Sequence, residues 1–198
     1  MPDPRLAAYI ETQIVNKVLL GMARAGTPFR GTMFAGLMLI PDRDPALIEI
    51  NVRFGDPETQ ILTNILEGDF CELLMAAARG ALDARAPVAV ATDRHALCVI
   101  LAAPGYPAAP RLGEPIEGLD AAAAIDGVRV YHAGTLARAG QTLTAGGRVL
   151  AVTGIGHTLE AAHERAYRGA AAIDFDGKQF RRDIAQSAFR ARDPAGPR

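Results

Sequence analysis

Three polar side chains stand at alternate positions of one strand-like stretch, where they are well placed to act on one ligand. Glu49, Asn51 and Arg53 are separated from one another by single apolar residues. Because successive side chains of a strand point to opposite faces, the polar groups share one face and the apolar residues share the other. A carboxylate, an amide and a guanidinium in one row can converge on a ligand. A salt bridge between Glu49 and Arg53 on a solvated face is the alternative interpretation.

The stretch that carries these residues is predicted to be the second strand of a β-hairpin. Residues 5–24 have apolar residues at near-helical spacing, which predicts an amphipathic helix that stops near Gly26. The apolar run 32–40 predicts a first strand, and the proline- and aspartate-rich residues 41–45 predict a turn. A second strand then runs over residues 46–53.

Two short helices are predicted after the hairpin. Asp56 is a good N-cap and Pro57 suits the first helical position, so a helix is expected over residues 58–66. Asp69 caps the next helix, which is expected to end near Gly80. The polar row of the strand therefore leads directly into a helix N-terminus.

The sequence changes character after residues 81–87, which resemble a linker. Beyond them, short apolar runs alternate with glycine- and proline-containing turns, and one helical pattern interrupts them. The tail 191–198 is predicted to be disordered. The strands predicted here are 87–92, 95–103, 128–133 and 148–153, and the helix is 158–172 with Thr158 as its N-cap.

Composition excludes several classes of function. The chain has 198 residues, with 21 Lys and Arg against 22 Asp and Glu, so no basic field favours nucleic acid. No apolar run approaches the roughly 18 residues of a membrane span. Cys71 and Cys98 lie far apart in apolar surroundings, which indicates buried thiols in a reducing compartment, and we expect the cytoplasm. The four histidines show no zinc-site spacing.

The string EINVRFGDPETQ, from Glu49 to Gln60, resembles a specific signature. It is similar to the E-x-N-x-R-F-G-D-P-E-x-Q motif of the phosphoribosylamine–glycine ligases, also called glycinamide ribonucleotide synthetases, in the ATP-grasp superfamily. Other strings match this family in the same order along the chain. They are GTPFRG at 26–31, AGLM at 35–38, GYP at 105–107, IEGL at 116–119, HAGT at 132–135, GGRVL at 146–150 and RRDI at 181–184.

The resemblance implies a fold and a reaction. It implies an α/β (α+β) chain: the C-terminal half of an ATP-grasp domain over residues 1–86, then a small strand-rich domain over residues 87–190. The family acts in purine biosynthesis and joins glycine to 5-phosphoribosylamine, with ATP split to ADP and phosphate. Glycine first becomes glycyl phosphate, and the amine then displaces the phosphate. Phosphoryl transfer of this kind depends mostly on positioning and charge neutralisation.

The resemblance also implies roles for residues of the signature. Glu49 and Asn51 match the family's metal-ligand positions for Mg²⁺ or Mn²⁺ beside ATP, and hard oxygen ligands suit these ions. Arg53 would steady the phosphoryl group, as both a nucleotide-binding and a catalytic residue. Asp56, as a catalytic residue, and Glu58, as a substrate-binding residue, would lie at the substrate mouth. The alternatives are that Asp56 is only a helix cap and Glu58 only a favourable first-turn acid.

A second candidate element is the Gly146, Gly147 and Arg148 string. It is predicted either to be a hairpin turn with a solvated arginine, or to bind the substrate's phosphate through backbone N–H groups and a guanidinium.

In the family, a Rossmann-like domain and the first half of the ATP-grasp domain precede the part that this sequence resembles. The helix at 5–24 and the sheet at 32–53 would then expose apolar surface that the other half normally covers. We therefore expect a complementing N-terminal half or a homo-oligomer as partner. Two alternatives to a catalytic role are a binding module that no longer catalyses and a fragment that works only when complemented.

Overall fold

The computed structural model describes residues 3–40, 43–82 and 88–192, which form two compact units. The first unit contains the residues up to Gly55 together with Glu67–Ala89. The second contains Asp56–Leu66 together with the residues from Val90 onward. The division into domains at residues 86 and 87 stays a prediction, because the compact units are not contiguous in sequence.

The first unit opens with the predicted helix, which contains a wider turn in its middle. It consists of α1 (Pro4–Tyr9), the π-helical segment η1 (Ile10–Val15) and α2 (Asn16–Arg24). The side chain of Asp3 caps the start by accepting a hydrogen bond of 2.9 Å from the Arg5 backbone N–H. At the other end, Gly26 takes a φ of +77°, a conformation that glycine adopts without steric cost.

The predicted hairpin is present. β1 (Phe34–Met38) pairs antiparallel with β2 (Ala46–Asn51), with a register shift between Gly36 and Leu37. The second strand ends at Asn51, two residues before the expected end at Arg53. The cause is the partner strand: Asn51 lies opposite Phe34, the first residue of β1.

The helix that follows the hairpin in the first unit has both predicted caps. α4 (Phe70–Arg79) begins after Asp69, whose carboxylate accepts a hydrogen bond of 2.8 Å from the Glu72 backbone N–H. It ends at Gly80 with a φ of +69°, the left-handed conformation typical of a helix C-terminus. The chain passes between the units at two short strands, of which only the second, within the predicted strand 87–92, was expected. They are β3 (Leu66–Glu67) and β4 (Ala89–Val90).

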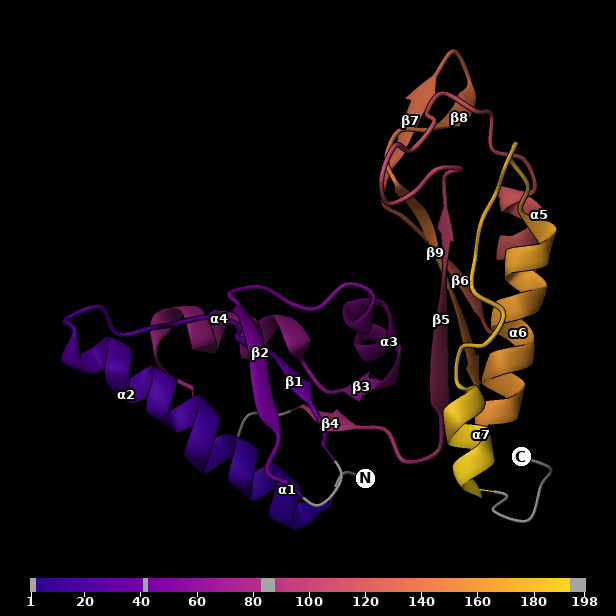
Figure 1. The fold of residues 1–198 in the computed structure, drawn as a ribbon. Helices are drawn as coiled ribbons and strands as arrows, with labels where there is room; N and C mark the ends of the chain where they lie inside the picture. Colours follow the sequence, from indigo (N-terminus) through magenta and orange to yellow (C-terminus); the bar gives the residue numbers. More distant parts are fainter. Residues whose placement is uncertain (1–2, 41–42, 83–87, 193–198) are drawn as a thin grey trace. The chain divides into compact units, whose positions relative to one another are not determined.

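The second unit is built on a three-stranded antiparallel sheet in the order β5-β9-β6 (Figure 1). β5 (His95–Ala102) and β6 (Val128–His132) flank β9 (Arg148–Gly156). All three strands were predicted, and β9 extends three residues beyond its expected end. The connection before them, expected over 81–87, lies largely outside the described residues.

One face of this sheet is covered by α6 (Leu159–Ala172), as Figure 1 shows. The helix approaches the sheet closely because its contact face consists of small residues, and Gly154 of β9 lies directly beneath it. A Cβ at Gly154 would lie well under 3.0 Å from the backbone of Ala162 and Ala166. This interface is the main core. Its members include Leu97, Val99, Leu101, Val128, Leu150, Val152, Ala162, Ala166, Ala170 and Ile173.

Both ends of α6 have hydrogen-bond partners. At its start the Thr158 hydroxyl accepts a hydrogen bond of 3.1 Å from the Ala161 backbone N–H, as predicted. At its end the Lys178 ammonium donates to the carbonyl of Ala170 at 3.1 Å and to that of Ile173. A cation at a helix C-terminus also interacts favourably with the helix dipole. The helix is therefore held at both termini.

The remaining elements escaped prediction because each is short. β7 (Thr135–Arg138) and β8 (Gln141–Thr144) form a hairpin whose two turn residues, Ala139 and Gly140, have φ values of +49° and +80°. Two-residue hairpin turns are usually predicted from an Asn-Gly or Asp-Gly pair, and an Ala-Gly pair predicts such a turn less strongly. The other elements are α5 (Leu119–Ala123) and α7 (Gln186–Arg192).

The first two residues of the tail predicted to be disordered, 191–198, are instead helical, because α7 runs to Arg192; residues 193–198 lie outside the described residues. Across the described helices, none combines the length and the hydropathy that crossing a bilayer requires.

Candidate functional site

Two oxygen-bearing side chains of β2 lie together on one face of the hairpin. The Asn51 amide Nδ2 donates a hydrogen bond of 3.0 Å to Glu49 Oε1. This bond orients the amide, so that its oxygen Oδ1 is the atom left for another partner. Glu49 lies opposite Gly36 of β1, and a Cβ at that glycine would lie 3.1 Å from the Glu49 Cγ. The hairpin thus presents a carboxylate and an amide side by side, with a glycine providing the room.

Arg53 does not continue this row as a strand residue. It follows the end of β2, and its Nη1 donates a hydrogen bond of 2.8 Å to the Phe54 carbonyl. The expectation that Arg53 alternates with Glu49 and Asn51 along a strand is wrong, because β1 has no residue opposite it. Arg53 is exposed and follows Glu49 closely in the chain. Because it lies outside the strand, the alternation of strand side chains does not determine which way its side chain points.

Asp56 lies in the second unit and is held by two donors. Arg148 Nη1 donates to the Asp56 backbone carbonyl at 2.9 Å and to its Oδ2 at 3.2 Å. Gln60 Nε2 donates to the other carboxylate oxygen, Oδ1, at 2.9 Å. The interpretation of Asp56 as an N-cap is wrong: α3 (Glu58–Ile65) is preceded by Pro57 as its cap residue, with no side-chain cap hydrogen bond. The Asp56 carboxylate is engaged by side chains instead.

The pair of Asp56 and Arg148 remains accessible to solvent. Their side chains are 45% and 42% exposed, so the ion pair is screened by water and adds little to stability. Glu58, the first residue of α3, is also exposed and adds a second carboxylate nearby in the chain. Its place in the first turn also suits the helix dipole, so both interpretations of Glu58 stand. A half-exposed, pre-oriented carboxylate is suited to contact a ligand.

Gly146 and Gly147 lead into β9 just before Arg148, and packing accounts for both glycines. A Cβ at Gly146 would lie 2.9 Å from the Gly134 Cα, and one at Gly147 would collide with the Tyr106 ring. The Gly147 carbonyl also accepts a hydrogen bond of 2.9 Å from the Ala103 N–H. These contacts favour a structural interpretation of the two glycines, and phosphate binding there stays a prediction.

A group of polar residues beneath α3 was missed by the sequence analysis. Asn64 Nδ2 donates to the Tyr131 hydroxyl at 2.6 Å and to the Gln60 carbonyl at 2.6 Å. The Thr153 hydroxyl also donates to the Gln60 carbonyl, at 3.4 Å. The bond from Asn64 to Tyr131 attaches α3 to β6, and the bond from Thr153 attaches it to β9. They join residues 67 and 93 positions apart, and no local pattern announces such contacts.

The two cysteines differ in their environment: Cys71 is exposed and Cys98 is buried. The expectation that both are buried is therefore wrong for Cys71, which lies in the first turn of α4. Burial raises the pKa of the Cys98 thiol to about 11, with smaller contributions from the negative charges of Asp56 and Glu58. A hydrogen bond with Thr153 acts in the opposite direction.

We predict that the folded chain exposes one reactive thiol near pH 8. Cys71 reacts with a chromogenic disulfide reagent, while Cys98 reacts only after unfolding, because it is buried and its thiolate is disfavoured. Titration of thiols with and without denaturant checks this. Since the Cys98 pKa is raised above its ordinary value of 9.0, its contribution to folding is lost as pH rises through about 11. Labelling of Cys98 in the folded chain would contradict the prediction.

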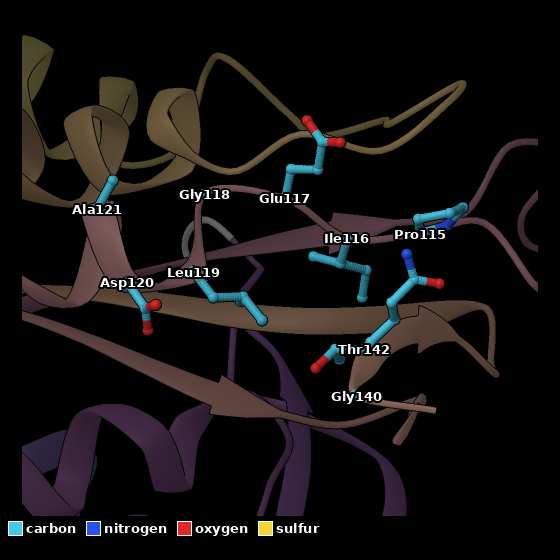
Figure 2. A pocket seen from close by; sticks show the side chains of 10 residues that line it. Pro115, Ile116, Glu117, Gly118, Leu119, Asp120, Ala121, Gly140 and Thr142 are labelled. Carbon is cyan, nitrogen blue, oxygen red and sulfur yellow. The ribbon is translucent and has the colours of Figure 1, made fainter. Parts of the chain in front are cut away.

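A separate cavity of about 560 Å³ lies in the second unit (Figure 2). Its two acidic residues, Glu117 and Asp120, point in different directions in this view, so their carboxylates do not converge. None of the residues predicted to form the site lines it. The lining residues are Pro115, Ile116, Glu117, Gly118, Leu119, Asp120, Ala121, Gly140, Gln141 and Thr142.

Comparison with known protein families matches both parts of the chain. Residues 2–59 match the ATP-grasp (A) domain of phosphoribosylglycinamide synthetase, and residues 96–187 match its C domain. The hairpin with Glu49 and Asn51 therefore lies within part of an ATP-grasp domain. The chain belongs to the phosphoribosylglycinamide synthetase family.

Curated relatives agree with this assignment. The chain is 45% identical over 188 residues to a phosphoribosylamine–glycine ligase of Streptomyces coelicolor, covering 94% of this chain and 45% of that protein. It is 42% identical to the ligase of the same name from Synechocystis, covering 94% of this chain and 44% of that protein. The chain thus spans a little under half the length of these relatives.

Solved structures support the same fold. The crystal structure of a phosphoribosylamine–glycine ligase from Thermotoga maritima superposes with a TM-score of 0.79 at 35% identity, covering 93% of this chain and 44% of that chain. An N5-carboxyaminoimidazole ribonucleotide synthetase from the same organism superposes with a TM-score of 0.55 at 16% identity, covering 87% of this chain and 43% of that chain. The second likeness concerns the fold alone.

Proposed function

We propose that this chain is the C-terminal portion of a ligase that joins glycine to 5-phosphoribosylamine and splits ATP to ADP and phosphate. The observation that best supports this proposal is the pair of Glu49 and Asn51. These two side chains are hydrogen-bonded to each other on one face of β2, inside the region that matches the ATP-grasp domain. The curated relatives of this family bear the name phosphoribosylamine–glycine ligase. The whole reaction is assigned to the assembled enzyme, by which we mean this chain together with the partner that completes its site.

The oxygen donors of β2 fit a hard divalent cation. Glu49 and Asn51 would hold Mg²⁺ or Mn²⁺ together with ATP phosphates and water, because magnesium keeps several such ligands beside one or two from the protein. The chemistry supplied in such a site is neutralisation of phosphate charge. The hydrogen bond from Asn51 keeps the Glu49 carboxylate oriented, and Gly36 opposite it leaves its side chain room.

The residues after β2 would act on the transferred groups. Glycine's carboxylate attacks the γ-phosphate, glycyl phosphate forms, and the amine of phosphoribosylamine then displaces phosphate. Arg53 would bind the nucleotide and the phosphoryl group with its exposed guanidinium. Asp56 would accept a hydrogen bond from the attacking amine, in an orientation that Arg148 supports. Glu58 would bind an ammonium or amine group of a substrate.

The start of β9 would contribute to binding the second substrate. Arg148 is half-exposed and carries the guanidinium nearest to Asp56 in the described hydrogen-bond network. We place the phosphate of phosphoribosylamine near Arg148. Because Gly146 and Gly147 have no side chains, their backbone N–H groups could lie close to this phosphate. The packing contacts of both glycines also supply a purely structural reason for them.

The partner that completes the site would cover the apolar face of the hairpin. Ile48 of β2 is 62% exposed and Met38 of β1 is exposed as well. Leu39 and Val52, just beyond the ends of these strands, are also exposed. Apolar clusters of this kind mark an interaction surface. The chain spans under half of its relatives, so the occupant we propose is the polypeptide that corresponds to their first half. A homo-oligomer is the alternative.

Release of ADP tests the function. We expect glycine-dependent ADP release with Mg-ATP and freshly generated phosphoribosylamine when this chain is mixed with the first half of the Streptomyces coelicolor relative. Omitting glycine is the matched control. Release by this chain alone, with light scattering that shows an oligomer, would favour the homo-oligomer. If folded protein releases no ADP in either assay, the result would favour a binding module without catalysis.

We place this reaction in the cytoplasm. Both Cys71 and Cys98 are free thiols in the structure, which suits a reducing compartment.

A further inference from the structure

The side chain of Gln60 is held in an arrangement that leaves one of its polar atoms without a partner. Its Nε2 donates to Asp56 Oδ1 at 2.9 Å. Its Oε1 is buried and has no hydrogen-bond partner within the described residues. Exchanging the two ends of the amide would not help, because an oxygen would then face the Asp56 carboxylate. The bond to Asp56 is therefore made at the cost of a desolvated acceptor.

The fold does not need this side chain to attach α3. The helix is tied to the sheet by the backbone carbonyl of Gln60, which accepts from the Thr153 hydroxyl, and by Asn64 Nδ2, which donates to the Tyr131 hydroxyl. The Ile65 carbonyl adds a hydrogen bond of 2.7 Å from the Ala91 N–H. A backbone carbonyl is present whatever residue stands at position 60. A costly side-chain arrangement that attachment does not require points to a role at the site.

That role is visible in how Asp56 is held. Its Oδ1 accepts from Gln60 and its Oδ2 accepts from Arg148, so each carboxylate oxygen has its own donor. One donor alone would let the carboxylate rotate about the bond to Cβ. Two donors, from α3 and β9, fix the plane of the carboxylate and leave the remaining lone pairs pointing in set directions. Catalytic efficiency depends strongly on such orientation.

We propose that Gln60 is a positioning residue that acts through Asp56. It holds the Asp56 carboxylate in the plane from which it contacts the attacking amine of the second substrate. This proposal rests on the ligase function proposed above. It goes further by naming a residue that touches no substrate itself.

The chemistry predicts that variants at this position behave differently from ordinary destabilising ones. Gln60→Met keeps a similar length, removes the donor and also removes the unpaired acceptor. We expect its midpoint of thermal unfolding to equal or exceed that of the wild type. We expect turnover per folded molecule to fall by about 10- to 100-fold in the assembled enzyme, with an unchanged KM for ATP. Gln60→Glu, which places an acceptor against Asp56, should be at least as slow.

The matched control is Gln141→Met, the same exchange at an exposed position of β8. It should leave both turnover and unfolding unchanged. Turnover of Gln60→Met within about twofold of the wild type, measured on folded protein, would overturn the proposal. A lower unfolding temperature together with unchanged turnover would show a purely structural role.

A measurement on this chain alone separates the positioning role from the ligase function. The carboxyl ¹³C signal of Asp56 should move in Gln60→Met and stay in place in Gln141→Met. If the signal does not move in Gln60→Met, the positioning role is overturned whatever the assembled enzyme does. If it moves but the wild-type assembly releases no ADP, the contact is real and the ligase function has failed.

Discussion

Glu49→Gln should lower glycine-dependent ADP release by the assembled enzyme by about 10²- to 10³-fold. Glutamine keeps the shape of the side chain and can still accept the hydrogen bond from Asn51 Nδ2. It lacks the negative charge that binds a divalent cation. Such a cation supplies several kcal/mol of transition-state stabilisation, and about 1.4 kcal/mol corresponds to a tenfold change in rate. Steady-state ADP release at saturating Mg-ATP measures the loss.

The control for this variant is Glu11→Gln, which makes the same exchange at an exposed position of η1. It should leave ADP release unchanged. Circular dichroism should show that Glu49→Gln keeps its helical content, since Glu49 makes its contacts at the surface of the hairpin. Near-normal turnover of Glu49→Gln in a complemented enzyme would remove Glu49 from the mechanism.

Gly154→Ala should have the largest effect on folding of any single methyl addition to β9. The new Cβ would lie well under 3.0 Å from the backbone of Ala162 and Ala166, and neither β9 nor α6 can move without opening the core between them. Overpacking a well-filled core costs about 1–3 kcal/mol, and a collision with backbone belongs at or above the upper end. Urea unfolding, followed by the fluorescence of the tyrosines, measures the change.

Gly21→Ala is the matched control. Gly21 lies inside α2, with no atom within 4 Å of a Cβ built on it. Alanine in a helix interior is favoured over glycine by about 1 kcal/mol, so this variant should be neutral or slightly more stable. Hydrogen exchange of the β9 amides should accelerate in Gly154→Ala only. Unaltered protection of β9 there would show that α6 can move away from the sheet.

The parts of the structure that were predicted correctly depend on short-range signals. The hairpin follows from apolar runs on either side of a turn, and period-two alternation placed Glu49 and Asn51 together. The caps at Asp69 and Thr158 were recognised because a capping side chain bonds to a backbone N–H three residues along. In each case, the residues that determine the local structure lie within a few positions of it in the sequence.

The failures have equally physical reasons. Arg53 was expected on the strand because alternation continues in the sequence, but pairing stops where β1 has no further residue. Asp56 was expected to cap α3, but Arg148 and Gln60 engage its carboxylate instead. Arg148 lies 92 residues away from Asp56 in the chain, and nothing local indicates that β9 begins beside it. Side-chain networks of this kind follow from the assembled fold.

The path of the chain between the two units affects how the protein can be synthesised. α3 belongs with β9, yet it is made 93 residues before Thr153, the residue to which Gln60 is bonded. During synthesis on a ribosome, α3 cannot dock until the rest of the first unit and most of the sheet have emerged. Contacts of such high sequence separation form late and slowly. A nascent chain would therefore carry α3 undocked for most of its synthesis. A cut anywhere within Glu67–Ala89 would leave α3 and its sheet on different fragments.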